Sequence, residues 1–396
     1  MQTRTLLPRG RYGARAAVLL AAIALPFLSA PASATFTKSA AASHGAATAS
    51  CFYRSTVQSG STTSTANGTT TVTITSVTMA KAFLVFSTRH DSNRPVGSEV
   101  TGRLASATTV EFNRVTDEAS PVTITIQWYV VEYNCGVNVQ RGVATPTNPT
   151  TDVTITAVNS VAAAFVTWSK TPSATDTGWG DNDPMLGVLT STTNLQLRQN
   201  VGDAGHAVWW QVIEFTDSTK INVQTGTTSF TGASTSTTAT LATAVTTSRT
   251  FVLVGTRSSG PGTDIGSGMV RGRLTNSTTI TLDRSAANYD VTEISWQAVE
   301  LKEGTTVQSG TTTLGSGTSS ATASLTALVL NRSTAFASTQ TGGGQNGGRT
   351  AYTADDVIGV AAATLALTST TQLTLTRSST AAAADIAWFV VSWGLP

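Results

Sequence analysis

The chain has 396 residues, of which 40% are hydrophobic and 12% are charged, and its formal net charge is +2. So small a charge provides no basic field for nucleic acid or anionic lipid, and both are excluded as partners. Thr, Ser, Val, Ala and Gly dominate the composition, which favours strands over helices.

The N-terminal residues have the three-part layout of a secretory signal peptide. Four arginines precede the apolar run "AAVLLAAIALPFLSA", and Ala32-Ser33-Ala34 follows it. We expect residues 1–34 to be removed, 35–50 to form a flexible leader, and the protein to be secreted or held at the cell surface. Without the four arginines, 20 basic residues remain against 22 acidic ones, a formal charge of −2. No later segment is long and apolar enough to span a membrane.

A short motif, Val-Gln-x-Gly, returns at intervals of 82, 84 and 84 residues, with its glutamine at Gln58, Gln140, Gln224 and Gln308. A tryptophan follows each copy, 70 to 80 residues later, at Trp128, Trp210, Trp296 and Trp388. Between motif and tryptophan are "KAFLVFSTR", "AAFVTWSK", "RTFVLVGTR" and "TAFASTQ", which we align as one strand. The motif, the aligned strand and the tryptophan thus occur in the same order four times. This recurrence predicts tandem repeats at 51–136, 137–219, 220–304 and 305–396.

Within a repeat, apolar and polar residues alternate, as in "VTITIQWYVVEY". We count about six strands per repeat, joined by Ser/Thr/Gly-rich turns, and no amphipathic helix. The predicted fold is all-β, with four tandem antiparallel β-sandwich units. Because about 80 residues can bury a core of their own, we expect the units to behave as beads on a string.

The two cysteines, Cys51 and Cys135, flank the strands of the first repeat. An exported protein favours a disulfide between them. Antiparallel pairing of the first and last strands would bring the two residues together.

Each closing strand turns apolar on both faces after its tryptophan. The added apolar pairs are Val131 and Tyr133, Ile213 and Phe215, Val299 and Leu301, and Val391 and Trp393. We expect a neighbouring repeat to cover them, and the alternative is a partner chain, which would make a homo-oligomer through these strand ends.

A glutamate follows three of the tryptophans by four residues, at Glu132, Glu214 and Glu300. Strand pairing would place each one near its motif glutamine, Gln58, Gln140 or Gln224, so we interpret these residues as structural hydrogen-bonding groups. The three histidines and two cysteines match no metal-binding or nucleophile motif. We therefore predict a protein that is not an enzyme and that has no cofactor.

The connection after the aligned strand differs most between repeats, which is the usual layout of a binding surface on a constant scaffold. In repeat two it offers Trp179 for stacking on a sugar ring, and Asp176, Asp181, Asn182 and Asp183 as oxygen donors. Arg89 and Arg257 open the same connection in repeats one and three. Calcium held by Asp181 and Asp183 is an option, although their spacing differs from that of an EF-hand loop. The alternative is a solvated turn whose tryptophan folds onto the core.

The Val-Gln-x-Gly opening, the six-strand estimate and the tryptophan near the close resemble the H-type lectin domain. The resemblance implies a small antiparallel β-sandwich that binds N-acetylgalactosamine-type sugars, commonly as a trimer. Similar sandwiches occur in phage tail and bacterial surface proteins that serve display or spacing.

These observations predict a secreted, multivalent protein of the lectin or adhesin type that binds extracellular glycan or a cell surface. The runner-up is a structural shaft, or a surface-layer or filament component. A glycan hydrolase is the third class, and it requires two carboxylates that converge in a cleft.

Overall fold

The structure is a computed structural model that describes residues 53–92, 94–115, 122–174, 179–202, 205–258, 268–287, 291–302, 304–342 and 358–394. The predicted signal peptide, the leader and Cys51 lie outside this part of the chain, so the disulfide with Cys135 stays a prediction. Cys51–Pro396 form one compact unit.

The chain is all-β, as predicted, and its described residues form eight three-stranded antiparallel sheets. Each repeat contributes two of these sheets. In repeat one the first sheet has the order β1 (Ser55–Ser64), β6 (Ile124–Tyr133), β3 (Ala82–Arg89), and the second has the order β2 (Gly68–Thr73), β5 (Thr109–Arg114), β4 (Thr101–Ser106). In repeat two the strands are β7 (Val137–Ala144), β12 (Ala207–Phe215), β9 (Ala164–Thr171), and β8 (Thr150–Thr154), β11 (Asn194–Arg198), β10 (Leu186–Ser191).

Repeats three and four have the same strand order. Repeat three contains β13 (Ile221–Thr228), β18 (Val291–Leu301), β15 (Thr250–Ser258), and β14 (Ser236–Thr240), β17 (Thr279–Asp283), β16 (Arg271–Asn276). Repeat four contains β19 (Thr306–Leu314), β24 (Ala384–Ser392), β21 (Ser333–Thr341), and β20 (Ser320–Ser324), β23 (Gln372–Arg377), β22 (Ala363–Ser369).

The helices are single turns that connect strands. Four of them precede the third strand of a repeat: η1 (Met79–Lys81), η2 (Val161–Ala163), η4 (Thr247–Arg249) and η5 (Leu330–Arg332). The others are η3 (Ser218–Lys220), at the junction of repeats two and three, and α1 (Pro95–Ser98) and η6 (Ile358–Val360), in the variable connections of repeats one and four.

The glycine of each Val-Gln-x-Gly motif makes room for the tryptophan of the same repeat. Gly142 lies opposite Trp210 in the antiparallel register, and a Cβ at position 142 would lie 2.5 Å from Cζ2 of that indole. The same distance is 2.6 Å for Gly60 and Trp128 and 2.4 Å in both remaining pairs, Gly226 with Trp296 and Gly310 with Trp388. The motif and the tryptophan, far apart in sequence, are therefore one packing unit.

The motif glutamine holds the turn that follows the second strand. Gln140 Oε1 accepts a hydrogen bond from the Thr156 N–H at 2.8 Å, and its Nε2 donates to the Thr156 carbonyl at 2.7 Å. The same pair of bonds links Gln58 to Thr75, Gln224 to Thr243, and Gln308 to Thr326. The glutamine side chain thus replaces a backbone partner for the turn.

The recurrent glutamates bind the same turns as the glutamines do. The sequence predicts a pair between each glutamate and its motif glutamine, and the structure shows no such pair among the described hydrogen bonds. Glu214 Oε1 accepts from the Asn159 N–H at 2.6 Å, three residues beyond the backbone group that Gln140 binds. Glu132 and Glu300 accept from the Thr78 and Thr246 N–H groups in the same way. Both side chains thus supply acceptors to backbone N–H groups of the turn, and Glu300 Oε2 also accepts from Asn222 Nδ2 of the facing strand at 3.3 Å.

Each repeat also contacts the next one through the open edge of a strand. The strand β3 lies at the edge of its sheet, and Gln211 of repeat two binds both backbone groups of Leu84 in β3, at 2.9 Å each. Gln297 of repeat three binds Val166 of β9 with the same geometry. An unpaired strand edge is a liability in a β protein, and here a side chain of the following repeat covers it.

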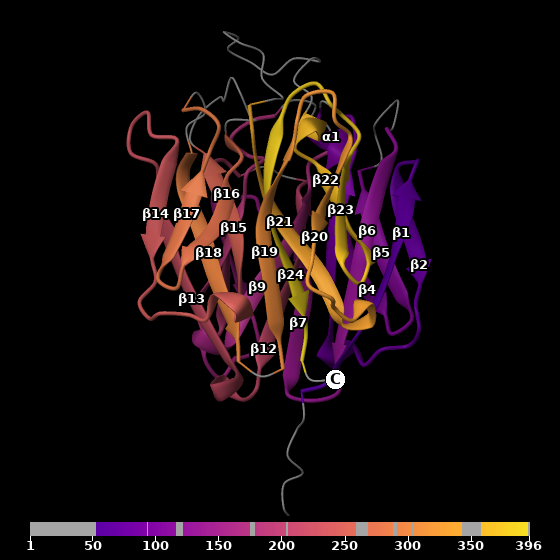
Figure 1. Ribbon diagram of the computed structural model, residues 1–396, viewed down its shortest axis with the longest axis vertical. Coiled ribbons are helices and arrows are strands. Elements are labelled where there is room, and N and C mark those ends of the chain that lie inside the picture. The colour runs from indigo at the N-terminus through magenta and orange to yellow at the C-terminus, as the bar shows by residue number, and fades with distance from the viewer. Residues whose placement is uncertain are drawn as a thin grey trace, which may run out of the picture. The chain divides into compact units, whose positions relative to one another are not determined.

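The fourth repeat contacts the first, so the contacts form a closed cycle. The Leu365 N–H of β22 donates to Ser87 Oγ of β3 at 3.0 Å, and the Tyr129 hydroxyl donates to the Leu365 carbonyl at 2.8 Å. Repeats three and four meet in an equivalent way, through the Gly272 N–H and Ser338 Oγ at 2.9 Å. The strands of all four repeats therefore stand side by side around a common interior (Figure 1).

The apolar strand ends meet in a core that all four repeats share. Their eight side chains are at most 3% exposed and belong to one cluster. At its centre, Trp393 contacts the rings of Phe83 and Phe251 with centroid distances of 5.3 and 5.7 Å. Neighbouring repeats thus cover the strand ends, and the prediction of beads on a string is wrong. The surface proposed for a homo-oligomer is buried within the chain.

The fourth repeat also corrects the strand alignment. Thr334 faces Val391 in the register, whereas phenylalanines face the equivalent residues: Phe83 with Val131, Phe165 with Ile213, and Phe251 with Val299. The sequence alignment of "TAFASTQ" matches Phe336 with Phe83. In the structure the equivalent residue is Thr334, two positions earlier. The Trp393 indole, whose Nε1 donates to Thr334 Oγ1 at 2.9 Å, takes the volume that a phenylalanine fills elsewhere.

Replacing Gly142 with alanine tests the packing unit. We expect Gly142→Ala to lower the free energy of unfolding by about 1–3 kcal/mol, because the new Cβ overlaps the Trp210 ring. Urea denaturation followed by tryptophan fluorescence measures the change. The control is Gly342→Ala, where no atom lies within 4 Å of the added Cβ, and we expect a change within about 0.5 kcal/mol. Equal losses in the two variants would contradict the close packing of Gly142 against Trp210.

Candidate functional site

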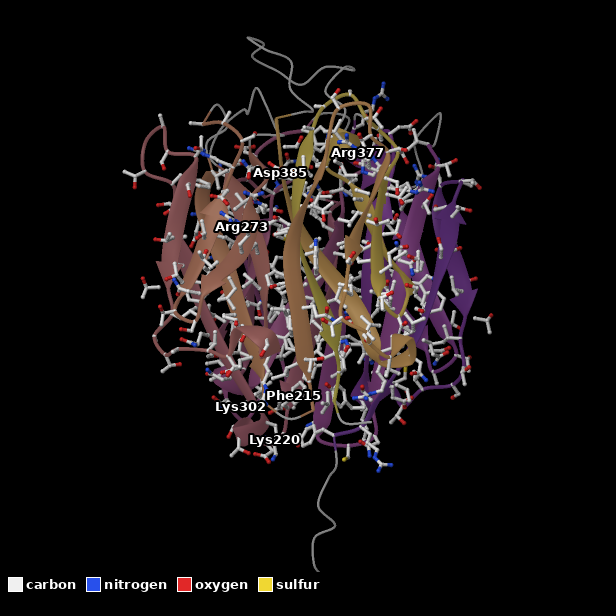
Figure 2. The ribbon with its side chains drawn as sticks, in the orientation of Figure 1. Phe215, Lys220, Arg273, Lys302, Arg377 and Asp385 are labelled. Carbon is white, nitrogen blue, oxygen red and sulfur yellow. The ribbon has the colours of Figure 1, made fainter. Side chains whose placement is uncertain are left out.

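Residues of all four variable connections meet in one cavity of about 370 Å³, which we call the mouth. Its lining includes His90 and Glu99 of repeat one, Lys170 and Trp179 of repeat two, Met269 of repeat three and Ile358 of repeat four. The helix α1 of the first connection lies at the end of the molecule opposite the C-terminus (Figure 1). Figure 2 shows the two ends through their labelled residues, with Arg377 near the upper end and Phe215 near the lower one.

A second cavity, of about 500 Å³, lies between the third strands of the four repeats, and we call it the axial cavity. The four strands contribute Phe86, Trp168, Val254 and Ala337 from equivalent positions. Phe86, Trp168, Ser169, Met269 and Ala361 line both cavities, so the mouth adjoins the axial cavity.

Of the predicted ligand-binding residues that the structure describes, Trp179 alone lines the mouth. Its side chain is half-buried, and its Nε1 is buried without a hydrogen-bond partner among the described residues. A buried indole N–H usually has an acceptor. The Nε1 atoms of Trp128, Trp210 and Trp296 in the repeat cores are buried without a described partner too, so this feature gives no sign of a ligand, and the case for Trp179 rests on its place in the cavity lining.

The predicted oxygen donors of repeat two shape their own loop. Asp183 Oδ2 accepts from the Gly180 N–H at 2.6 Å, and Asp181 Oδ2 accepts from Asn200 Nδ2 at 2.9 Å. The Asn182 carbonyl accepts from Lys170 Nζ at 3.3 Å. Asp176 lies outside the described residues. Within the described part of the chain, no group of three or more His, Cys, Asp or Glu side chains could hold a metal ion, so calcium gains no support.

Lys170 is the centre of a charged cluster at the mouth. Its Nζ lies 3.4 Å from Glu99 Oε2 and 3.4 Å from Asp183 Oδ1, and the lysine and Asp183 side chains are 6% and 1% exposed. Burial alone would lower the pKa of Lys170, but the two carboxylates outweigh burial and raise that pKa. Glu99, at 20% exposure, is the member of the cluster that a ligand can reach.

Two carboxylates therefore converge beside a cavity, which the hydrolase class requires. Hydrolysis of a glycoside also needs one carboxyl group that donates its proton to the leaving oxygen. Glu99 and Asp183 instead both lie against the same ammonium group. The arrangement provides hydrogen-bonding groups at a fixed place and gives no support to acid catalysis.

His90 lies in the wall of the mouth as a buried neutral side chain. Its Nδ1 accepts a hydrogen bond from the Ser92 N–H at 3.2 Å, so this nitrogen carries no proton. Burial, and then the nearby Arg114 guanidinium, lower the pKa of His90 to about 4.

Arg89 and Arg257 do not line the mouth. Arg257 Nε lies 3.4 Å from Glu293 Oε2, and the same glutamate binds Arg198 of repeat two at 2.9 Å. Arg89 faces Thr125 at the end of β3 and is half-buried. The structure gives the Arg257 side chain a role between repeats two and three and brings neither arginine to Trp179.

Sequence reasoning missed Lys170 and Glu99. A signal for Lys170 exists, because its register position in the third strand is that of Thr88 and Thr256 in repeats one and three. One charged residue among equivalent threonines indicates a local partner. Glu99 has no such signal, since it lies in the variable connection, where the residues of the other repeats cannot be aligned with it.

Comparison with known proteins gives no family assignment. No family model matches the sequence, and a search of curated proteins found no match. Among the described residues there is no helix with the length and apolar character needed to cross a membrane.

The pKa of His90 predicts a loss of stability in weak acid. Because the folded pKa is about 4 and the unfolded value 6.5, protonation favours the unfolded chain. The contribution is complete above pH 6.5 and is lost as the pH falls toward 4, up to about 3 kcal/mol. The measurement is the free energy of unfolding by urea at pH 4 to 7, for the protein and for His90→Asn, which keeps an acceptor for Ser92. Parallel pH profiles of the two proteins would contradict the prediction.

Proposed function

We propose that the protein is a secreted glycan-binding protein built from four β-sandwich repeats, and that the mouth is its binding site. The observation that carries the proposal is the convergence of the four variable connections on one cavity. A constant scaffold with variable residues gathered at one place is the usual design of a binding site.

The chemistry of the mouth suits a sugar ring. A pyranose has an apolar face that packs on a flat aromatic side chain and hydroxyl groups that need hydrogen-bond partners. Trp179 supplies the aromatic face, and Glu99 supplies a partly exposed acceptor held in place by Lys170. The volume of about 370 Å³ lies in the range of small-molecule sites.

The geometry favours one site per chain. The sequence predicted multivalency because it treated the four repeats as separate units. Since the residues from four repeats line the same cavity, each chain would present one composite site.

A structural shaft or surface-layer component is the second candidate. The apolar strand ends are buried between repeats, which that class requires, but they are buried within one chain. A filament would therefore need contacts between the ends of molecules. Assembly without sugar binding is the outcome that would favour it.

A glycan-array screen tests the proposed site. We expect saturable binding by the protein, a loss of at least tenfold in affinity for Trp179→Ala, and a smaller loss for Trp179→Phe, which keeps an aromatic face of smaller area. The matched control is Val143→Ala, which truncates an apolar side chain that is 50% exposed and lines neither cavity.

Two results would overturn the proposal. Folded protein that binds no glycan would remove the glycan-binding function. Binding that Trp179→Ala retains in full would keep the function and move the site away from the mouth.

A further inference from the structure

The axial cavity has a lining unlike that of the mouth. Most of its described lining residues have apolar side chains, such as Leu84, Val85, Val252, Leu253 and Phe336 of the third strands, while polar atoms form an equal share of the cavity surface. No Asp, Glu, Lys, Arg or His is among the described residues that line it. This described lining therefore offers no charged group to a polar ligand.

Most polar groups in this lining already have partners. Gln211 binds the Leu84 backbone and also donates to Thr167 Oγ1 at 3.1 Å. Ser169 Oγ accepts from the Gly102 N–H at 3.0 Å, and Ser338 Oγ accepts from the Gly272 N–H at 2.9 Å. These groups hold neighbouring repeats together, so a ligand gains little by hydrogen bonding to them, and an apolar ligand leaves none of them unsatisfied.

The axial cavity is bounded by aromatic rings on one side and adjoins the mouth on the other. Phe336 lines it and stacks on Phe251 with a centroid distance of 4.9 Å, within the shared core. Trp168 and Met269 line both the axial cavity and the mouth. A molecule that enters from the mouth would therefore pass from charged to apolar surroundings.

The residue at position 337 explains why the axial cavity is not filled by side chains. Ala337 faces Trp388 in the register, as Phe86 faces Trp128 and Trp168 faces Trp210. Its side chain is exposed although it lines an interior cavity, whereas the side chains of Phe86 and Trp168 are half-buried. The alanine of repeat four leaves free the volume that an aromatic ring occupies in repeats one and two.

We propose that the axial cavity binds the hydrocarbon chain of an amphiphile whose polar head lies in the mouth. The head-group assignment rests on the proposed function, while the hydrocarbon site rests on the axial cavity alone. At about 500 Å³ the cavity is in the size range of ligand pockets, which combine mostly apolar side chains with a small number of polar groups.

The first experiment titrates the full chain with N-phenyl-1-naphthylamine, an uncharged probe that fluoresces in apolar surroundings. We expect saturable binding of one probe per chain, and displacement by octyl glucoside below its micelle concentration but not by glucose. Along the hexyl, heptyl and octyl glucosides the affinity should rise about fourfold for each CH₂ that enters the cavity. No saturable binding, or equal affinities along the series, would overturn the proposal.

The matched variants are Ala337→Phe and Val329→Phe. The first places in repeat four the residue that repeat one has at the equivalent position, and we expect it to weaken probe binding at least tenfold in a protein that still melts cooperatively. The second adds the same ring at a position that is 51% exposed and lines neither cavity, and it should leave binding unchanged. Full probe binding by Ala337→Phe would place the probe outside the axial cavity.

The two proposals fail separately. Glycan binding with no probe binding would remove the hydrocarbon site and keep the proposed function. Probe binding with a blank glycan array would remove the sugar head group and keep the hydrocarbon site.

Discussion

Each repeat has apolar side chains on both faces of its first sheet, and this is the constraint on which the rest of the structure depends. One face packs against the second sheet of the same repeat, as when Trp210 and Val212 share a cluster with Leu195 and Leu197. The other face, at the end of each closing strand, has no cover within the repeat. Burying this face contributes about 25 cal/mol of folding free energy for each Å² of apolar area removed from water. Four such faces therefore stabilise one another when they meet.

The burial of these faces closes the cycle of repeats. The closed cycle also decides which parts of the chain can vary in sequence between repeats. The shared core at one end contains Trp393 and three phenylalanines in direct ring contact, which leaves little freedom to change them. The connections at the other end differ in length and composition between the repeats. Loops that differ in length and composition can therefore face a common space, and the mouth and the axial cavity are the result.

The closed cycle also changes how many binding sites four repeats can form. In separate units, four repeats would offer four equal sites. In a closed cycle they supply four different walls of one site, and the differences between repeats become the source of specificity. Glu99 from repeat one and Lys170 from repeat two form a contact that neither repeat has alone.

Much of the fold could be predicted from the sequence, because the relevant signals are local. The alternation of apolar residues predicted strands, and the motif spacing predicted four repeats. The apolar pairs such as Val131 and Tyr133 also indicated a covered surface, and the structure shows that the cover comes from neighbouring repeats. What the sequence could not show was the closure, since nothing local distinguishes contact with the next repeat from contact between the fourth and the first.

The candidate site was harder to predict for the same reason. Trp179 stood out as an aromatic residue in a polar loop. Lys170 and Glu99 meet only because two repeats adjoin, and the axial cavity exists only when all four do. The acidic residues that looked like ligands, Asp181 and Asp183, satisfy their own loop, which is the common role of short polar side chains in turns.

Small-angle X-ray scattering of the chain without residues 1–34 tests the closed cycle most directly. A single compact body of this size has a radius of gyration of about 20 Å, and four separate units of about 80 residues on a string would exceed about 30 Å. For a closed cycle we expect the smaller value at all protein concentrations. A value above about 30 Å, in protein shown to be monomeric, would contradict the closed cycle and with it both proposed sites.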